Sequence, residues 1–210
     1  MSCVDICESV DQSIQAVAQL KKASSLAFLE EAAHRLVRLF GRGGKLLVAG
    51  NGGSCCDATH FAEELTGFYR EKRRALAAMA LADAGHITCV ANDVGYEQVF
   101  ARAIEAYGRP GDLFMALTTS GNSKNLILAI DYARARGLQT IALLGRGGGA
   151  LKGKADLELI IEGSTSSDRI QEAHMTALHI LVELIEAQLP AEAYLDQHLD
   201  VGGAQAISLQ

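Results

Sequence analysis

His60 and Glu64 lie four residues apart, shortly after the glycine-rich turn Gly50–Ser54. Four residues is a little more than one helical turn, so both side chains fall on one face of a helix. An imidazole and a carboxylate placed in this way can bind a metal ion together or transfer protons. The preceding run Lys45–Ala49 is typical of a buried parallel strand. The turn therefore falls at the sheet edge where open α/β folds bind their ligands.

A second helix, predicted for Ser167–Gln188, carries further donor side chains at Gln171, His174 and His179. Imidazole nitrogens, a carboxylate and an amide oxygen together suit Zn²⁺. On a straight helix Gln171 and His179 are about 12 Å apart and rotated by about 80°, so both reach one ion only by leaning together or from different subunits. His174 is the alternative ligand. For an isolated histidine and glutamate pair, a solvated helix face is the alternative to a metal site.

Hydroxyl side chains are concentrated in the loop Thr118–Ser123, which follows an apolar run and leads into a helical stretch. Hydroxyls and backbone N–H groups at a helix N-terminus suit a phosphate. The loop lacks the Gly-Lys-Ser/Thr of a P-loop, and the same residue types also cap ordinary helices. Four hydroxyls and one glycine within six residues favour a phosphate site.

Other polar residues have less specific interpretations. Asn92 and Asp93 are expected in a turn, where they either bind sugar hydroxyls or serve the turn itself. Asp168 is either a site residue or the start of its helix. The basic stretch Arg70–Arg74 favours a solvated linker, with attraction of an anionic substrate as the alternative.

The elements that must position these residues follow from the apolar pattern. Five apolar runs predict strands at 45–49, 77–81, 112–118, 140–144 and 157–161. The intervals between them predict helices at 54–66, 84–91, 96–107 and 123–136, after two leading helices at about 4–22 and 25–40. Alternating strands and helices predict an α/β fold with a parallel sheet covered on both faces.

The length of 210 residues predicts a single domain over 1–190. It comprises N-terminal helices in 1–42, the sheet and its crossover helices in 45–163 and a last helix at 167–188, followed by a flexible tail at 191–210. A net charge of −6 argues against nucleic acid or an anionic membrane as partner. With no signal segment and no membrane span, we expect a cytoplasmic protein that acts on a small molecule. Five cysteines indicate no disulfide framework.

Five motifs together resemble the sugar isomerase (SIS) family, and within it the phosphoheptose isomerases, over nearly the whole chain before the tail. The motifs are Gly50–Ser54, His60–Gly67, His86–Asp93, Thr119–Ser123, and Arg169–Glu172 with His179. The resemblance implies a three-layer α/β/α SIS fold with an N-terminal helical extension. It implies conversion of sedoheptulose 7-phosphate to D-glycero-D-manno-heptose 7-phosphate, the first step toward ADP-heptose and the lipopolysaccharide core. It also implies a homotetramer with sites near subunit boundaries.

The resemblance also assigns roles to individual residues. One Zn²⁺ per subunit would be held by His60, Glu64, Gln171 and His179. In an enediol mechanism Glu64 would act as the base and His179 as the acid. The expected substrate contacts are Asn51, Gly52, Gly53, Ser54, Glu64, Asn92, Asp93, Thr118, Thr119, Ser120, Ser123, Asp168 and Gln171.

The chain departs from the family pattern at Phe68, where many members carry an arginine, and this removes a possible anion contact. An alternative function is that of the SIS-domain adaptor that binds the bacterial replication initiator. Those adaptors lack acidic and imidazole side chains at the positions of Glu64 and His179, and this chain has both. A different sugar-phosphate isomerase or a sugar-phosphate sensor is the second alternative, because pocket length is not visible in a sequence.

Overall fold

Five parallel strands form one sheet in a computed structural model of the chain, which describes residues 5–164 and 166–193. The strands are β1 (Leu46–Gly50), β2 (Ala78–Ala80), β3 (Leu113–Thr118), β4 (Gln139–Gly145) and β5 (Leu157–Ile161). Their order in the sheet is β2-β1-β3-β4-β5, and every neighbouring pair is parallel. All residues of β1 and β3 are buried, because helices cover both faces of the sheet.

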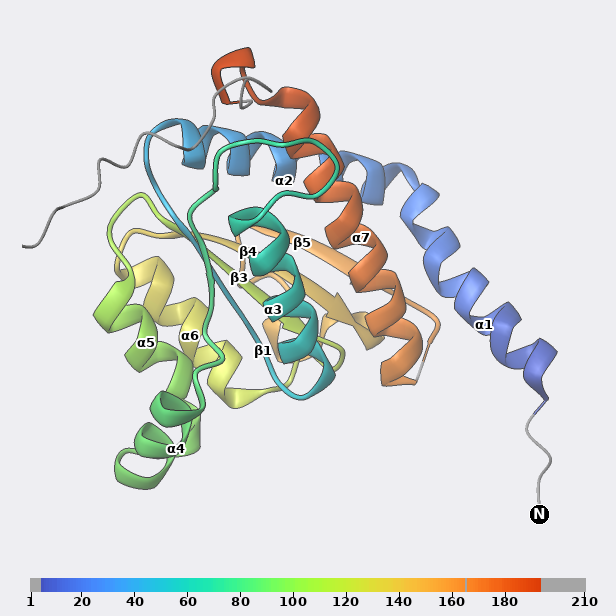
Figure 1. Cartoon of the computed structure of the whole chain (residues 1–210). Helices are drawn as coiled ribbons and strands as arrows, with labels where there is room; N and C mark the ends of the chain where they lie inside the picture. Colours follow the sequence, from blue (N-terminus) through green and yellow to red (C-terminus); the bar gives the residue numbers. More distant parts are fainter. Residues whose placement is uncertain (1–4, 165, 194–210) are drawn as a thin grey trace, which may run out of the picture.

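Helices lie on both sides of the sheet (Figure 1). The α-helices are α1 (Ile6–Ala18), α2 (Ala23–Gly41), α3 (Gly53–Thr66), α4 (Ala84–Asp93), α5 (Val99–Tyr107), α6 (Lys124–Ala135) and α7 (Ser167–Gln188). Short 3₁₀ segments are η1 (Gln19–Lys21), η2 (Tyr96–Gln98), η3 (Arg146–Leu151) and η4 (Ala191–Ala193).

Two separate cores make the fold three-layered. Side chains of α2, α3 and α7 pack on one face of the sheet with Leu113 and Met115 of β3. Side chains of α4, α5 and α6 pack on the other face with Phe114 and Ala116, the alternate residues of the same strand. The predicted α/β fold with five parallel strands and an N-terminal helical extension is thus confirmed.

The helix α1 packs along α7 at the side of the molecule (Figure 1). Arg169 of α7 donates hydrogen bonds to the hydroxyls of Ser9 and Ser13 on α1. The helix predicted for residues 4–22 begins at Ile6 and gives way to η1 after Ala18, and residues 1–4 lie outside the described part.

The C-terminal part of the chain is described as far as residue 193. Most of the predicted tail at 191–210 therefore lies outside the described residues, apart from η4. Within the described ranges, no helix is both long enough and apolar enough to span a bilayer.

Candidate functional site

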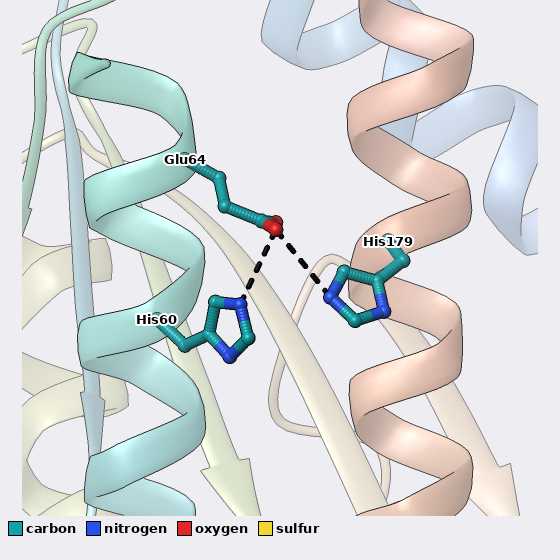
Figure 2. A group of neighbouring side chains, drawn as sticks. All are labelled: His60, Glu64 and His179. Atoms are coloured by element: carbon teal, nitrogen blue, oxygen red, sulfur yellow. Dashed lines mark ion pairs between the residues drawn. The ribbon is translucent and has the colours of Figure 1, made fainter. Parts of the chain in front are cut away.

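Two neighbouring helices bring His60, Glu64 and His179 together (Figure 2). Glu64 Oε1 lies 3.2 Å from His60 Nε2 and 3.4 Å from His179 Nε2. The two imidazole rings meet edge to face, with centroids 5.2 Å apart. His60 and Glu64 come from α3 and His179 from α7, which pack against each other on the sheet. We call these three residues the triad.

The charge balance of the triad points to a cation. Glu64 is buried, and its Oε2 has no hydrogen-bond partner among the described residues. A buried carboxylate oxygen without a partner is costly unless a cation or a substrate group satisfies it. One ligand atom from each triad residue lies within 4.8 Å of the others. Two imidazoles and one carboxylate form a donor set that holds catalytic Zn²⁺ and leaves one position open, so the residues fit this ion.

Asp57, one turn before His60, adds a second, partly buried carboxylate on α3. Its Oδ2 likewise has no hydrogen-bond partner among the described residues. Burial raises the pKa of Asp57 to about 6, and the nearby His60 opposes this rise. Sequence reasoning missed this residue, although its spacing of three from His60 was a visible signal.

Gln171 belongs to α7, and its side chain lies against the first turn of α3 and outside the triad. Its Nε2 is 3.4 Å from Ser54 Oγ, to which it donates. A Cβ at Gly53 would come within 2.5 Å of the same amide nitrogen, so the glycine lets α7 approach the first turn of α3. The fourth predicted zinc ligand is thus placed at the opposite end of the site from His179.

His174 is a core residue, and the prediction of it as an alternative metal ligand is wrong. Its side chain is fully buried, and its Nε2 donates to the carbonyl of Leu144 in β4 at 3.1 Å. Burial lowers the pKa of His174 to about 4, so the ring stays neutral. It faces the sheet, whereas His179 faces α3.

A polar cavity of about 190 Å³ forms the other end of the site. It lies at the carboxyl edge of β1 and β3, as expected for a ligand site in a parallel sheet. Most of its lining consists of predicted substrate contacts. The lining residues are Asn51, Ser54, Leu117, Thr118, Thr119, Ser120, Ser123, Ser167 and Gln171. We call it the hydroxyl cavity.

The turn between β1 and α3 is held by a reciprocal amide pair that the sequence did not reveal. Asn51 Nδ2 donates to Asn125 Oδ1 at 3.0 Å, and Asn125 Nδ2 donates to Asn51 Oδ1 at 2.9 Å. The hydroxyl of Tyr96 also donates to Asn51 Oδ1. Asn51 is therefore fixed at the cavity wall against α6. Asn125 is buried in the first turn of α6.

An arginine at the rim of the hydroxyl cavity was also missed. Arg146 Nη2 donates to Ser167 Oγ at 2.9 Å, and Ser167 Oγ also accepts from Thr119 Oγ1. Arg146 is the one non-glycine residue of the described ranges with a positive φ, of 49°. Left-handed backbone in such a residue is strained and is often found at functional sites. Its position directly after β4, at the carboxyl edge of the sheet, was an available signal.

Close backbone packing holds the loop Thr118–Ser123 against η3, which begins at Arg146. A Cβ at Gly121 would lie 1.8 Å from the carbonyl oxygen of Gly148 in η3. Gly121 has a φ of 64° and donates its N–H to Thr118 Oγ1. Only a glycine allows both the conformation and the approach. The loop Thr118–Ser123 and η3 therefore form one rigid wall.

Six predicted substrate contacts are not part of the cavity lining. Gly52 and Gly53 lie where β1 leads into α3, and Glu64 belongs to the triad. The other three lie farther along the chain. Asn92 and Asp93 are exposed in the last turn of α4, on the other face of the sheet, and Asn92 Nδ2 donates to Asp93 Oδ1. The prediction of a turn there is wrong, because the helix capped by Asp83 runs on through both residues. Asp168 is exposed in the first turn of α7 and accepts from Ser166, which lowers its pKa.

Comparison with known proteins finds a SIS domain model and several phosphoheptose isomerases that are similar to this chain. The SIS domain model matches residues 8–145. A phosphoheptose isomerase of Fusobacterium nucleatum is 52% identical over 168 residues, which are 80% of this chain and 86% of that protein. The structure of a phosphoheptose isomerase from Francisella tularensis matches with a TM-score of 0.82 and 36% identity, over 87% of this chain and 97% of that one. The phosphoheptose isomerase GmhA of Neisseria gonorrhoeae matches with a TM-score of 0.78 and 35% identity over the same shares.

Proposed function

Since this chain belongs to the SIS domain family, with phosphoheptose isomerases of about half identical sequence among its relatives, we propose that it isomerises sedoheptulose 7-phosphate to D-glycero-D-manno-heptose 7-phosphate. The observation that carries the proposal is the arrangement of one site with two ends. A hydroxyl-lined cavity suits a phosphate, and a triad on adjacent helices suits proton transfer. In this role the product would feed ADP-heptose synthesis and the lipopolysaccharide core.

The phosphate belongs in the hydroxyl cavity. Thr118, Ser120 and Ser123 line it, and the N-termini of α6 and α7 lie at its wall. Hydroxyls and helix N-termini both favour an anion. Arg146, held at the rim by Ser167, supplies positive charge beside them.

The sugar would lie along α7, because this helix contributes to both ends of the site. Ser167 and Gln171 line the cavity, and His179 belongs to the triad. Gln171 and His179 are about 12 Å apart along the helix axis, which gives room for a sugar chain between phosphate and reacting carbons. Asn51, fixed by Asn125, borders the same path.

The chain's own residues would carry out the proton transfers. The buried, unpartnered Oε2 of Glu64 would remove the proton from C1 of the ketose and return it to C2. His179 would donate a proton to the C2 carbonyl oxygen as the enediol forms, and would take one back from the C1 hydroxyl as the aldehyde forms. Glu64 Oε1 faces both imidazoles, so one carboxylate oxygen holds the triad together while the other stays available for the substrate.

Zn²⁺ is the cofactor we propose, one per subunit. His60, Glu64 and His179 would hold it, and Gln171 would be a fourth ligand if its amide left Ser54. When bound, the ion polarises the substrate carbonyl and stabilises negative charge on its oxygen.

We further propose a homotetramer that works in the cytoplasm. Asn92 and Asp93 lie on the far face of the sheet from the triad, so they would contact substrate only from a neighbouring subunit. The adaptor alternative is not favoured, because Glu64 and His179 are both present and assembled. A sugar-phosphate sensor would not need this triad.

Turnover of sedoheptulose 7-phosphate by Zn²⁺-loaded protein tests the proposal. Glu64→Gln, His179→Gln and chelator treatment should each lower the rate by a hundredfold or more, as expected for loss of an acid–base group. Ketose phosphates of shorter chain length are the matched substrates. A folded, metal-bound wild type that turns over none of them would refute the isomerase function.

A further inference from the structure

Four residues of the basic stretch Arg70–Arg74 are exposed, as in the solvated linker that its composition indicates, but Arg73 is buried. The side chain of Arg73 is fully buried, and its Nε donates to Glu186 Oε1 of α7 at 2.8 Å. Arg70 is exposed but pairs with Glu183, also on α7. The segment between α3 and β2 is therefore tied to the helix that carries His179.

Arg73 also binds the end of the helix that carries the other two triad residues. Its Nη2 donates to the carbonyl of Glu64 at 2.8 Å, and its Nη1 donates to that of Leu65 at 2.9 Å. The last carbonyls of a helix have no partner within the helix and attract positive charge. One buried guanidinium thus joins the C-terminal end of α3 to α7.

Glu186 completes this connection by fixing the backbone that follows α3. Its carboxylate accepts from the backbone N–H groups of Tyr69 and Arg70, in addition to Arg73 Nε. The chain at Tyr69 therefore has a defined position relative to α7. We call Arg73 and Glu186 the buried clamp.

The clamp places the ring of Tyr69 against the imidazole of His179. The two rings are stacked, with centroids 5.8 Å apart and planes 20° apart. The guanidinium of Arg70 lies 5.2 Å from the centroid of the Tyr69 ring. His60 meets His179 edge to face. His179 is thereby contacted by an aromatic ring on its face and by a triad partner at its edge.

We propose that Tyr69 is a positioning residue for His179, held in place by the buried clamp. Stacking keeps the imidazole from rotating, so Nε2 stays directed at Glu64 Oε1. Tyr69 acts through His179 and needs only its ring for this role. The proposal rests on the proposed function, since it assigns His179 a part in metal binding and proton transfer.

The test compares Tyr69→Phe, which keeps the ring, with Tyr69→Leu, which removes it. Tyr132→Leu is the matched control. The Arg136 guanidinium lies 5.9 Å from the centroid of the Tyr132 ring, as Arg70 lies over Tyr69, but Tyr132 is on α6. Zn²⁺ affinity is measured by chelator competition, and kcat and KM by turnover of sedoheptulose 7-phosphate. Thermal melting checks that each variant is folded.

Tyr69→Leu should bind Zn²⁺ about tenfold more weakly, the effect expected for loss of a group that orients a metal ligand. Its kcat should fall about tenfold or more with KM within threefold, because the reacting group is displaced while the phosphate end is intact. Tyr69→Phe and Tyr132→Leu should match wild type within twofold. Unchanged Zn²⁺ affinity and kcat in folded Tyr69→Leu would overturn the proposal.

The result stays informative if the proposed function itself fails. A wild type without turnover that still binds Zn²⁺ leaves the affinity comparison in force. If it binds no Zn²⁺ either, crystal structures of wild type and Tyr69→Leu decide the matter. A His179 ring that keeps its orientation in the leucine variant would overturn the positioning role, and a rotated ring would support it.

Discussion

Substituting Arg73 by methionine should strongly destabilise the chain, although the residue belongs to a stretch of charges that looks solvated. Its side chain is 0% exposed and that of its partner Glu186 is 6% exposed. Removing one member of a buried ion pair takes the opposite charge away from the member that remains, at a cost of about 3–5 kcal/mol. For a chain of this length each kcal/mol lowers Tm by about 2–4 °C, so Tm should fall by about 6–20 °C.

Urea denaturation followed by circular dichroism measures the loss, on metal-free samples at one protein concentration, because ligands and oligomerisation shift apparent stability. Arg102→Met is the control. Arg102 pairs with Glu105 on the surface, with side chains 52% and 45% exposed, and such pairs contribute about 0–1 kcal/mol. Adding Glu186→Gln to Arg73→Met should cost less than the sum of the two single changes, because the two residues interact. If Arg73→Met were no less stable than Arg102→Met, the account of the clamp would be wrong.

Three further predictions concern other parts of the site and core. Because burial holds the pKa of His174 at about 4 against 6.5 in the unfolded chain, the unfolded state alone takes up this proton as pH falls below 6.5. Stability should therefore drop by about 3 kcal/mol between pH 6.5 and 4, and urea melts of His174→Phe should show a smaller drop. Arg146→Gly removes a positive charge and suits the left-handed backbone, so stability should stay within about 1 kcal/mol of wild type. Inhibition of the Arg146→Gly variant by inorganic phosphate should be about tenfold weaker than inhibition of wild type. Unchanged inhibition would show that Arg146 does not bind the phosphate. Removing Zn²⁺ with a chelator should lower Tm, and added Zn²⁺ at about 100 times its Kd should restore about 2.7 kcal/mol in wild type but not in His60→Gln.

Most of the fold could be predicted because buried parallel strands appear in the sequence as unbroken apolar runs. The strand predicted at 112–118 occurs at Leu113–Thr118, and the one at 157–161 occurs at the same residues. The pairing of His60 with Glu64 was also predictable, because their relation depends only on local helix geometry. Features of this kind are set within a few residues of sequence.

Features that depend on partners far along the chain could not be predicted. The partner that buries Arg73 is 113 residues away, so the charge run gave no sign of it. His174 and His179 lie on one helix five residues apart, which turns them by about 140° from each other. Only the packing of α7 between β4 and α3 decides which of the two faces the core and which faces Glu64. In contrast, Asn92 and Asp93 were misplaced for a local reason, because turn-forming residue types continued a helix already capped by Asp83.

The two ends of the site are built in different ways, and this determines how each should fail. The hydroxyl cavity is formed by loops locked backbone to backbone, with Gly121 against Gly148. The triad instead depends on the relative position of α3 and α7. The clamp sets this position at the C-terminal end of α3. A perturbation that loosens the two helices should therefore reduce Zn²⁺ affinity and kcat before it affects the binding of inorganic phosphate. Equal loss of phosphate binding and Zn²⁺ affinity in mild urea would show that both ends unfold as one unit.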